Sequence, residues 1–415
     1  MLPGHPDKLC DAAADNAVAF ITRATGNSQC GVELACVFDR VAVTGRVASI
    51  HKYAVAALRD YQVHNMIRDA YATSGYGEDA AGHVWGPRPD DLKIDVYARI
   101  GTFADGEGEL RHLSDDQAVC VGYANSLAEC DGLPPAHWLA RRIARTLFEL
   151  RREKGAGQVG PDGKVLVRVA RMGRTWRPLS VSISLHHHEG SDWVFLNAFA
   201  QEAVETACAG RATPEIALNG AGMFVCGGPN GDNGQTGKKL VMDAYGPSVP
   251  IGGGAWSGKD FWKVDRRGGL LARAMAQRLV DVHGGDEARV TLEYYPGSDA
   301  PAHGEAIVDR RRIVLDCCTL TGDVVVPKLQ AIFTPSRSSA CEFDLKEATR
   351  WGHHAYLGEL HRELPEFVAS PKVTTSSTRR AGHSHELGVG HLADGAGTPE
   401  RARSDHSCNC ERFRL

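Results

Sequence analysis

Apolar side chains recur along this chain with the two spacings that distinguish helices from strands. Leu9, Ala13 and Ala17 fall on one helical face, so a helix is predicted over residues 7–25. Helical spacing returns at 51–72, 136–152, 194–208 and 268–283. Period-two patterns rich in β-branched residues predict strands near 32–38, 41–47, 94–100, 165–171 and 179–185. Both kinds of element are therefore mixed along the chain.

Pairs of strands followed by a helix recur about three times, which predicts an α+β or α/β protein built from three similar modules. Breaks rich in glycine at 104–109 and 227–237 indicate where modules meet. The expected domains are 1–103 (N-terminal), 110–226 (central) and 227–362 (C-terminal). The composition loses its large apolar residues after about residue 365, so 363–415 is predicted to be a disordered or loosely attached tail.

The composition narrows the classes of partner. The 415 residues carry a formal net charge of −4 and no long basic run in the folded part, which argues against nucleic acid or a membrane surface as the main partner. No run approaches the roughly 18 apolar residues of a membrane span, and the first residues lack a signal-peptide pattern. The expected location is the cytoplasm.

The twelve cysteines are scattered and are interpreted as reduced thiols. Cys408 and Cys410 lack the spacing of a zinc knuckle.

Two glycine-rich segments end in lysines. The first, FVCGGPNGDNGQTGKK, runs from Phe224 to Lys239 and follows a short apolar strand, an arrangement suited to bringing backbone and ammonium groups close to phosphate. It is not a P-loop, because Asp232 occupies the first glycine position and Lys239 the hydroxyl position. A glycine-rich surface turn is the alternative interpretation.

The second segment, GGGAWSGKDFWKVDR, runs from Gly252 to Arg266 and again combines glycines with lysines and a carboxylate. An exposed charged loop is the alternative, although Trp256 and Trp262 argue against a merely solvated segment. A third cluster, GHPDK, crowds a histidine, an aspartate and a lysine at the start of the first helix, where Asp7 could equally be a helix cap. Together the three segments offer cations for a polyphosphate and carboxylates for a hard divalent metal.

Three consecutive histidines, His186 to His188, suggest a metal site at first sight. Successive residues of a strand point to opposite faces, so three neighbours rarely converge on one ion. These histidines are therefore expected to lie on the surface.

Five motifs in order give the chain a family resemblance. They are GHPDK, DDQAVCVGYA (Asp115 to Ala124), PDGK (Pro161 to Lys164), GGPNGDNGQTGKK and GGGAWSGKDFWKVDR. In sequence and spacing they resemble the signatures of the S-adenosylmethionine synthetases (methionine adenosyltransferases), over about residues 4–360. The resemblance implies an α+β fold of three pseudo-symmetric two-layer α/β domains. It also implies a homodimer, or a dimer of dimers, with active sites shared between subunits.

The resemblance further implies a reaction and its cofactors. Methionine sulfur attacks C5′ of ATP, and the triphosphate leaves and is hydrolysed to pyrophosphate and phosphate. Two Mg²⁺ ions per site and K⁺ are expected to assist. A neutral thioether needs no general base, so catalysis should rest on orientation and on stabilising the leaving triphosphate.

By motif matching, the resemblance assigns roles to particular residues. The implied catalytic residues are His5, Lys259, Lys239 and Asp116. The implied ATP-binding residues are His5, Asp162, Lys164, Phe224, Asp232, Lys238, Lys239, Ala255 and Lys259. The implied methionine-binding residues are Asp116, Asp232, Lys263, Arg46 and Phe103. The implied metal ligands are Asp7 and Asp265 for magnesium and Glu33 for potassium.

The departures from the family pattern concentrate at the amino-acid substrate. Arg46 stands where the family has a glutamate of the methionine pocket, and Phe103 stands for the glutamine of the gating loop. Lys238 replaces an arginine, which keeps the charge but loses bidentate phosphate recognition. Two alternatives to a methionine adenosyltransferase stay open: a non-catalytic ATP-binding regulatory subunit, and an adenosyltransferase for another thioether. A generic P-loop phosphotransferase fails on the missing glycine and hydroxyl residue.

Overall fold

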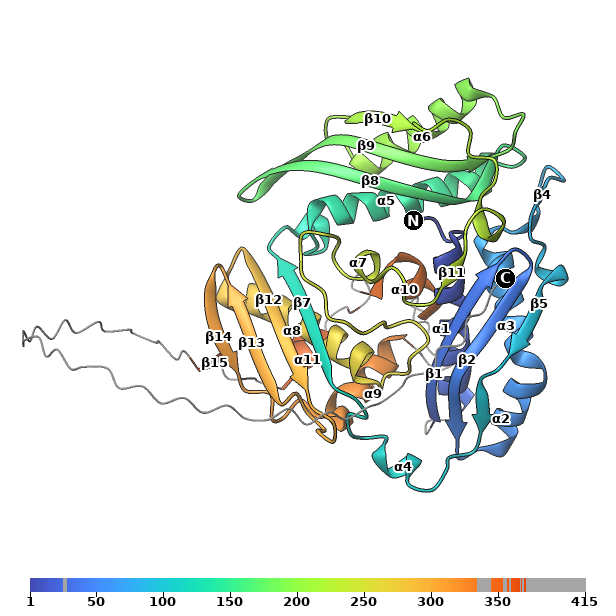
Figure 1. Ribbon diagram of the computed structural model, residues 1–415. Helices are drawn as coiled ribbons and strands as arrows, with labels where there is room; N and C mark the ends of the chain where they lie inside the picture. The colour runs from blue at the N-terminus through green and yellow to red at the C-terminus, as the bar shows by residue number, and fades with distance from the viewer. Residues whose placement is uncertain are drawn as a thin grey trace, which may run out of the picture. The chain divides into compact units, whose positions relative to one another are not determined.

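Three large β-sheets, each with helices packed against it, organise the described part of the chain (Figure 1). The structure is a computed structural model and describes residues 1–24, 28–333, 345–353, 357, 360–365, 367 and 369–370. These residues belong to one unit, which spans 1–372. The α+β architecture predicted from the sequence is confirmed.

The first sheet has the order β11-β1-β2-β5, and β6 also pairs with β2. Its strands are β1 (Ser28–Val37), β2 (Arg40–Ser49), β5 (Lys93–Val96), β6 (Arg99–Gly101) and β11 (Gly234–Gln235). Its helices are α1 (Pro6–Ala24), α2 (Lys52–Ala57) and α3 (Val63–Ser74). Alternate residues of β1 are buried, as the period-two pattern predicts. The helix predicted at 51–72 is divided by a π-helical turn, Leu58–Gln62.

The second sheet has the order β10-β9-β8. Its strands are β8 (Val159–Met172), β9 (Thr175–His187) and β10 (Glu215–Leu218), and its helices are α5 (Pro135–Lys154) and α6 (Trp193–Cys208). The antiparallel pair β8 and β9 confirms the strands predicted at 165–171 and 179–185, which extend further than the pattern indicates. Both helices were also predicted, and each begins within one residue of the expected position.

The third sheet has the order β15-β14-β13-β12-β7. Its strands are β7 (Ala118–Asn125), β12 (Glu287–Tyr294), β13 (His303–Val308), β14 (Arg311–Leu315) and β15 (Ala369–Ser370). Helices α8 (Val264–His283) and α9 (Gly322–Phe333) belong with it. The remaining short elements are β3 (Gly77–Glu78), β4 (Val84–Trp85), α4 (Glu107–Leu110), α7 (Leu240–Asp243), α10 (Leu345–Trp351) and α11 (Leu360–Glu363).

The sheets do not follow consecutive stretches of the chain. Strand β7 lies within the range 110–226 but pairs with β12, and β11 lies within 227–362 but pairs with β1. The predicted domain boundaries therefore stay predictions. Helix α11 ends at the predicted beginning of the tail, residue 363, and strand β15 lies beyond it. Residues 371–415, with Cys408 and Cys410, lie outside the described residues.

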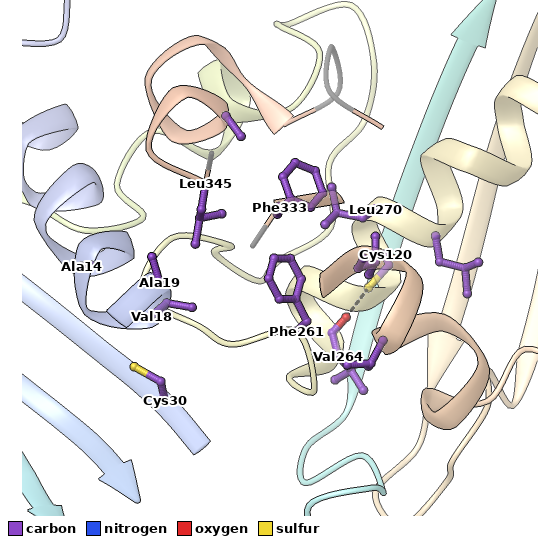
Figure 2. Close-up of a cluster of buried hydrophobic side chains, with 14 of the residues drawn as sticks. Ala14, Val18, Ala19, Cys30, Cys120, Phe261, Val264, Leu270, Phe333 and Leu345 are labelled. Atoms are coloured by element: carbon purple, nitrogen blue, oxygen red, sulfur yellow. Dashed lines mark hydrogen bonds between the residues drawn. The ribbon is translucent and has the colours of Figure 1, made fainter. Parts of the chain in front are cut away.

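A buried cluster joins the helix α1 region to the α8 region (Figure 2). Ala14 and Val18 of α1 and Cys30 of β1 are drawn there with Phe261, Leu270 and Phe333, all of them buried. The rings of Phe261 and Phe333 stack with centroids 5.6 Å apart. The Cys120 thiol donates a hydrogen bond to the carbonyl oxygen of Val264 at 3.4 Å. This shared core fixes the glycine-rich segment before α8 against both sheets.

The cysteines of the described residues are free thiols, as expected. Among those residues there is also no helix with the length and apolar character that crossing a membrane requires.

Candidate functional site

The GHPDK segment lies against the beginning of β8. The N–H of Leu2 donates to the carbonyl oxygen of Gly163 at 2.9 Å, and the Tyr76 hydroxyl donates to the carbonyl oxygen of Gly4 at 2.6 Å. A β-carbon added at Gly4 would lie 2.4 Å from the carbonyl oxygen of Pro161, so only glycine permits this approach. The predicted residue Asp162 is thereby placed beside the start of α1.

Asp7 connects the start of α1 to the first glycine-lysine segment. Its carboxylate is fully buried and accepts a hydrogen bond from the N–H of Gln235 at 3.0 Å. The ammonium groups of Lys238 and Lys239 lie 3.7 and 3.5 Å from its two oxygens. Asp7 Oδ2 accepts no hydrogen bond from any described residue. The residue therefore does more than begin a helix, since its carboxylate joins α1 to both lysines of the segment.

A second aspartate of α1 contacts the same segment and is absent from the sequence-based assignments. Asp11 accepts a hydrogen bond from the N–H of Gly237 at 2.9 Å. Lys8 donates to Asp11 at 2.9 Å and to Asp243 at 2.8 Å. Burial raises the pKa of Asp11 to about 6, opposed by the charge of Lys8. The helical spacing of four residues between Asp7 and Asp11 was the available signal that both face one loop.

His5 is buried and neutral. Burial lowers its pKa to about 2, and the nearby charges of Lys164 and Lys239 act in the same direction. Its Nδ1 accepts a hydrogen bond from the N–H of Asp7 at 3.2 Å. Because Nδ1 is an acceptor, the ring proton resides on Nε2. His5 is thus arranged as a neutral hydrogen-bond donor.

The second glycine-lysine segment adds another cation and another carboxylate. Lys259 pairs with Asp265 at 2.5 Å. The two glycine-lysine segments touch, since a β-carbon added at Gly237 would lie 2.4 Å from the β-carbon of Ala255. The N–H of Gly258 donates to the buried carboxylate of Asp15 at 2.8 Å, which anchors the segment to α1. Neither segment is a free surface turn.

The end of the site at β8 holds Asp162 and Phe224. Asp162 is buried and accepts a hydrogen bond from the N–H of Gly228 at 2.9 Å. Burial raises the pKa of Asp162 above its usual range, opposed by that hydrogen bond. Phe224 is half-buried, whereas Lys164 extends from an exposed position of β8.

The expectation that the three consecutive histidines lie on the surface is wrong for two of them. His186 and His187 are buried, and His188 is exposed. The strand β9 ends at His187, so strict alternation of faces stops there and both rings are enclosed by the segment that carries Phe224. No group of three or more metal-ligating side chains occurs among the described residues.

The residues expected to bind methionine are only partly brought together. Lys263 pairs with Asp115; Asp115 and the predicted Asp116 are both exposed, but Asp116 does not pair with Lys263. Lys263 and Asp115 line a cavity of about 120 Å³ together with Glu107. Asp232 and Glu33 are exposed, and neither lines that cavity. Sequence reasoning therefore missed Asp115, although it is the neighbour of the predicted residue.

The Arg46 side chain is hydrogen-bonded to the loop that contains Phe103 and ends in α4. Its guanidinium donates to both oxygens of Glu107, at 2.9 and 2.7 Å, and to the carbonyl oxygen of Thr102 at 2.8 Å. The Glu107 carboxylate also accepts a hydrogen bond from the N–H of Ala104 at 2.8 Å. Phe103 lies half-buried within the same loop. Arg46 thus fastens the loop between β6 and α4 to strand β2.

Comparisons with known proteins agree on one family. Residues 226–309 match the family described as S-adenosylmethionine synthetase, C-terminal domain. The S-adenosylmethionine synthase of Methylobacterium sp. (strain 4-46) is 31% identical over 327 residues, covering 75% of this chain and 81% of that protein. The S-adenosylmethionine synthase of Brachyspira hyodysenteriae is 32% identical over 389 residues, covering 88% of this chain and 92% of that protein.

A solved structure shares the fold. The structure of an unusual S-adenosylmethionine synthetase from Campylobacter jejuni matches with a TM-score of 0.70 at 23% sequence identity, covering 87% of this chain and 96% of that chain.

Proposed function

Because this chain belongs to the S-adenosylmethionine synthetase family, a family of methionine adenosyltransferases, we propose that it forms S-adenosylmethionine from ATP and L-methionine and hydrolyses the released triphosphate to pyrophosphate and phosphate. One observation carries the proposal. The start of α1 and the two glycine-lysine segments converge, with Asp7 contacting Gln235, Lys238 and Lys239. Such a convergence of backbone N–H groups, ammonium groups and carboxylates suits a metal-bound triphosphate.

The proposed chemistry needs no base. A bond forms between methionine sulfur and C5′ of ATP, the bond from C5′ to the bridging oxygen breaks, and the electron pair leaves with the triphosphate. Lys239 and Lys259 would stabilise the negative charge that develops. The neutral His5, with its proton on Nε2, would donate to the bridging oxygen. A neutral donor and fixed cations suit a reaction in which charge develops on a leaving oxygen.

The carboxylates fit hard divalent cations. Asp7 offers a buried oxygen that accepts no hydrogen bond from the described residues, and Asp265 offers a carboxylate held beside Lys259. We infer that these two residues hold the two Mg²⁺ ions and that Glu33 contributes to a K⁺ site. When bound, the ions would neutralise triphosphate charge. The proposed ATP site is completed by the other residues matched to the family motifs, namely Lys238, Asp162, Lys164, Phe224, Asp232 and Ala255.

The amino-acid side is proposed around Lys263. The cavity beside it combines the carboxylates of Asp115 and Glu107 with the cations of Lys263 and Arg111, which suits an amino acid that carries both charges. We keep as proposed contributors the residues Asp116, Asp232 and Phe103, which do not line this cavity. They would reach the methionine site only through a conformational change or from a second subunit. For Arg46, the ion pair with Glu107 supports an indirect role.

A homodimer, or a dimer of dimers, is the proposed assembly. Large apolar side chains are exposed on strands of different sheets, among them Leu166 of β8, Val119 of β7 and Val37 of β1. Single exposed apolar side chains are common on folded proteins, so the proposed assembly rests on membership of the family. The cytoplasm stays the predicted location.

The test is an assay of the purified chain with ATP, Mg²⁺, K⁺ and a panel of thioethers. The expected products are S-adenosylmethionine, pyrophosphate and phosphate, with methionine as the preferred thioether. Adenosylation of another thioether in preference to methionine would favour the alternative substrate, to which the altered Arg46 and Phe103 point. ATP binding without any adenosylated product would favour the non-catalytic regulatory subunit.

A further inference from the structure

Two adjacent histidines at the end of β9 hold the segment that carries Phe224. The N–H of His187 donates to the carbonyl oxygen of Phe224 at 3.0 Å, and the N–H of Phe224 donates to Nε2 of His187 at 3.0 Å. The other ring nitrogen, Nδ1, lies 2.8 Å from the carbonyl oxygen of His188. Because Nε2 accepts, the proton is on Nδ1 and donates to that carbonyl. Both ring nitrogens of His187 are therefore used in hydrogen bonds to the backbone.

His186 supports the same segment from the side. Its Nε2 lies 3.3 Å from the carbonyl oxygen of Val225, and its ring centroid lies 5.6 Å from that of Phe224. The ring is enclosed between two glycines, since a β-carbon added at Gly160 or Gly227 would lie 2.3 or 2.6 Å from it. Burial lowers the pKa of His186 to about 4, which keeps the ring neutral. His186 thus limits how far the Phe224 ring can turn.

The segment is also fixed at its far end. The N–H of Gly228 donates to the carboxylate of Asp162, so side chains from β8 and β9 hold both ends of a five-residue stretch. With the backbone fixed on both sides, the Phe224 ring has only its two side-chain torsions left to adjust. The placement of this aromatic face is therefore determined by contacts with β8 and β9.

We propose that His187 is a positioning residue for the nucleobase: by its paired hydrogen bonds with the backbone of Phe224, it places the aromatic face on which a purine stacks. The inference rests on the proposed function, which puts the adenine of ATP on Phe224. His187 then contributes to the affinity for ATP only by placing Phe224. The charged triphosphate is held by other residues, so its binding is independent of His187.

Two variants of the full chain separate the hydrogen bond from the bulk of the ring. In His187→Leu, the N–H of Phe224 loses its acceptor, so the Phe224 segment has to be ordered when the nucleobase binds, and this ordering cost reduces affinity by about tenfold. In His187→Gln, the side-chain amide oxygen reaches the position of Nε2 and restores the acceptor. Calorimetric titration with a non-hydrolysable ATP analogue and Mg²⁺ measures Kd for each chain. We expect the leucine variant to weaken binding about tenfold and the glutamine variant to stay within about threefold of the wild type.

Inorganic tripolyphosphate is the matched control ligand, because it has the charges of ATP without a base. Its Kd should be the same in all three chains. Equal weakening of both ligands in His187→Leu, or unchanged affinity for the ATP analogue, would overturn the inference. In the background of Phe224→Ala, His187→Leu should add less than about a twofold further loss, whereas additive losses would show that His187 does not act through Phe224.

These binding measurements do not depend on turnover. If the wild-type chain binds the ATP analogue but forms no S-adenosylmethionine, the proposed function fails while the Kd values still decide the role of His187. If the wild-type chain forms S-adenosylmethionine and the variants bind ATP equally well, the inference alone fails.

Discussion

The charged residues of the site are held by partners from distant parts of the chain. Asp7 meets Lys238 and Lys239 across more than 230 positions, whereas Lys259 is held by Asp265, a neighbour six positions along the chain. Side chains held by such partners are oriented before a ligand arrives, which reduces the entropy lost on binding. The loss of one cation should therefore affect the reaction more than the fold.

Lys259→Ala should lower turnover by roughly 30- to 1000-fold at saturating ATP, because a contact with the developing charge of the triphosphate contributes about 2–4 kcal/mol. Steady-state kinetics with ATP and methionine measure the change. Lys154→Ala is the control, since Lys154 lies at an exposed position near the end of α5 and pairs with Glu202. It should keep wild-type turnover. If Lys259→Ala retained more than a third of the wild-type rate, Lys259 would have no role at the triphosphate.

The buried His186 predicts a dependence of stability on pH. Its pKa is about 4 in the folded chain and 6.5 as the reference for the unfolded chain, so only the unfolded chain takes up a proton between these values. The stabilisation is complete above the higher value and is lost as the pH falls toward the lower one, by about 1.4 kcal/mol per pH unit. His186→Gln removes the titrating group. Urea unfolding at about pH 7 and about pH 5 should therefore show a smaller loss for the variant.

A similar loss in both proteins over that interval would show that the ring of His186 is protonated in the folded chain.

The pairing of Arg46 with Glu107 predicts that both residues act on methionine by the same route. Arg46→Met and Glu107→Gln should each raise the Michaelis constant for methionine by about two- to tenfold, because each releases the loop before α4. The Michaelis constant for ATP should not change. A much larger effect for Arg46→Met than for Glu107→Gln would place the Arg46 side chain in direct contact with methionine, as the sequence suggested.

At the scale of elements, glycines allow the loops of the site to approach one another. Gly228 has a φ of +63°, and a β-carbon added there would lie 1.9 Å from the Tyr76 hydroxyl, which donates to Gly4. Gly222 also has a positive φ, of +99°, but nothing lies within 4 Å of an added β-carbon. Both positions have a positive φ, but only Gly228 has a neighbouring atom that an added β-carbon would meet.

Gly228→Ala should lower the free energy of unfolding by about 2–4 kcal/mol, since backbone strain and a steric clash add. Gly222→Ala should cost only about 1 kcal/mol, from strain alone. Denaturant unfolding measures both. The Michaelis constant for ATP should rise in Gly228→Ala only, because only that change displaces the GHPDK segment through Tyr76. Equal costs for the two substitutions would mean that the Tyr76 side chain moves aside freely.

Elements with a strong local pattern could be predicted from the sequence. The helix at 7–25 and the hairpin over β1 and β2 have clear periodicity, and both are confirmed. The short strand β11 and the pairing of β7 with β12 could not be predicted, because two residues carry no periodicity and a strand's partner depends on the rest of the fold. The roles of Asp11 and His187 likewise depend on contacts more than 30 positions away along the chain.

At the scale of the whole molecule, the interleaving of strands makes the sheets dependent on one another. Strand β7 precedes the second sheet in the chain but completes the third, and β11 returns to complete the first. The glycine-lysine segment before α7 therefore spans between sheets, and its lysines meet α1 only if all of them are in place. We expect this site to be lost together with the fold, in one transition.

The C-terminal boundary of the folded unit gives the last prediction. Phe367 is buried under the guanidinium of Arg278, which lies 5.4 Å from its ring centroid. The same guanidinium donates to the carbonyl oxygen of Leu364 at 2.8 Å, and β15 pairs with β14. A chain ending at Ser370 keeps all of these contacts, whereas a chain ending at Glu363 loses them. The segment after residue 370 is poor in large apolar side chains, so removing it should not change the stability of the folded unit.

We therefore expect a chain ending at Ser370 to keep the melting temperature and the activity of the full chain. A chain ending at Glu363 should lose about 2–4 kcal/mol of unfolding free energy, from the removal of the buried Leu364 and Phe367 side chains and of the hydrogen bonds beside them. Phe367→Ala in the chain ending at Ser370 should reproduce more than half of that loss, because the buried ring carries most of the apolar area. A full-length melting temperature in the chain ending at Glu363 would show that Phe367 and β15 contribute nothing. A lower one in the chain ending at Ser370 would show instead that residues after 370 stabilise the folded unit.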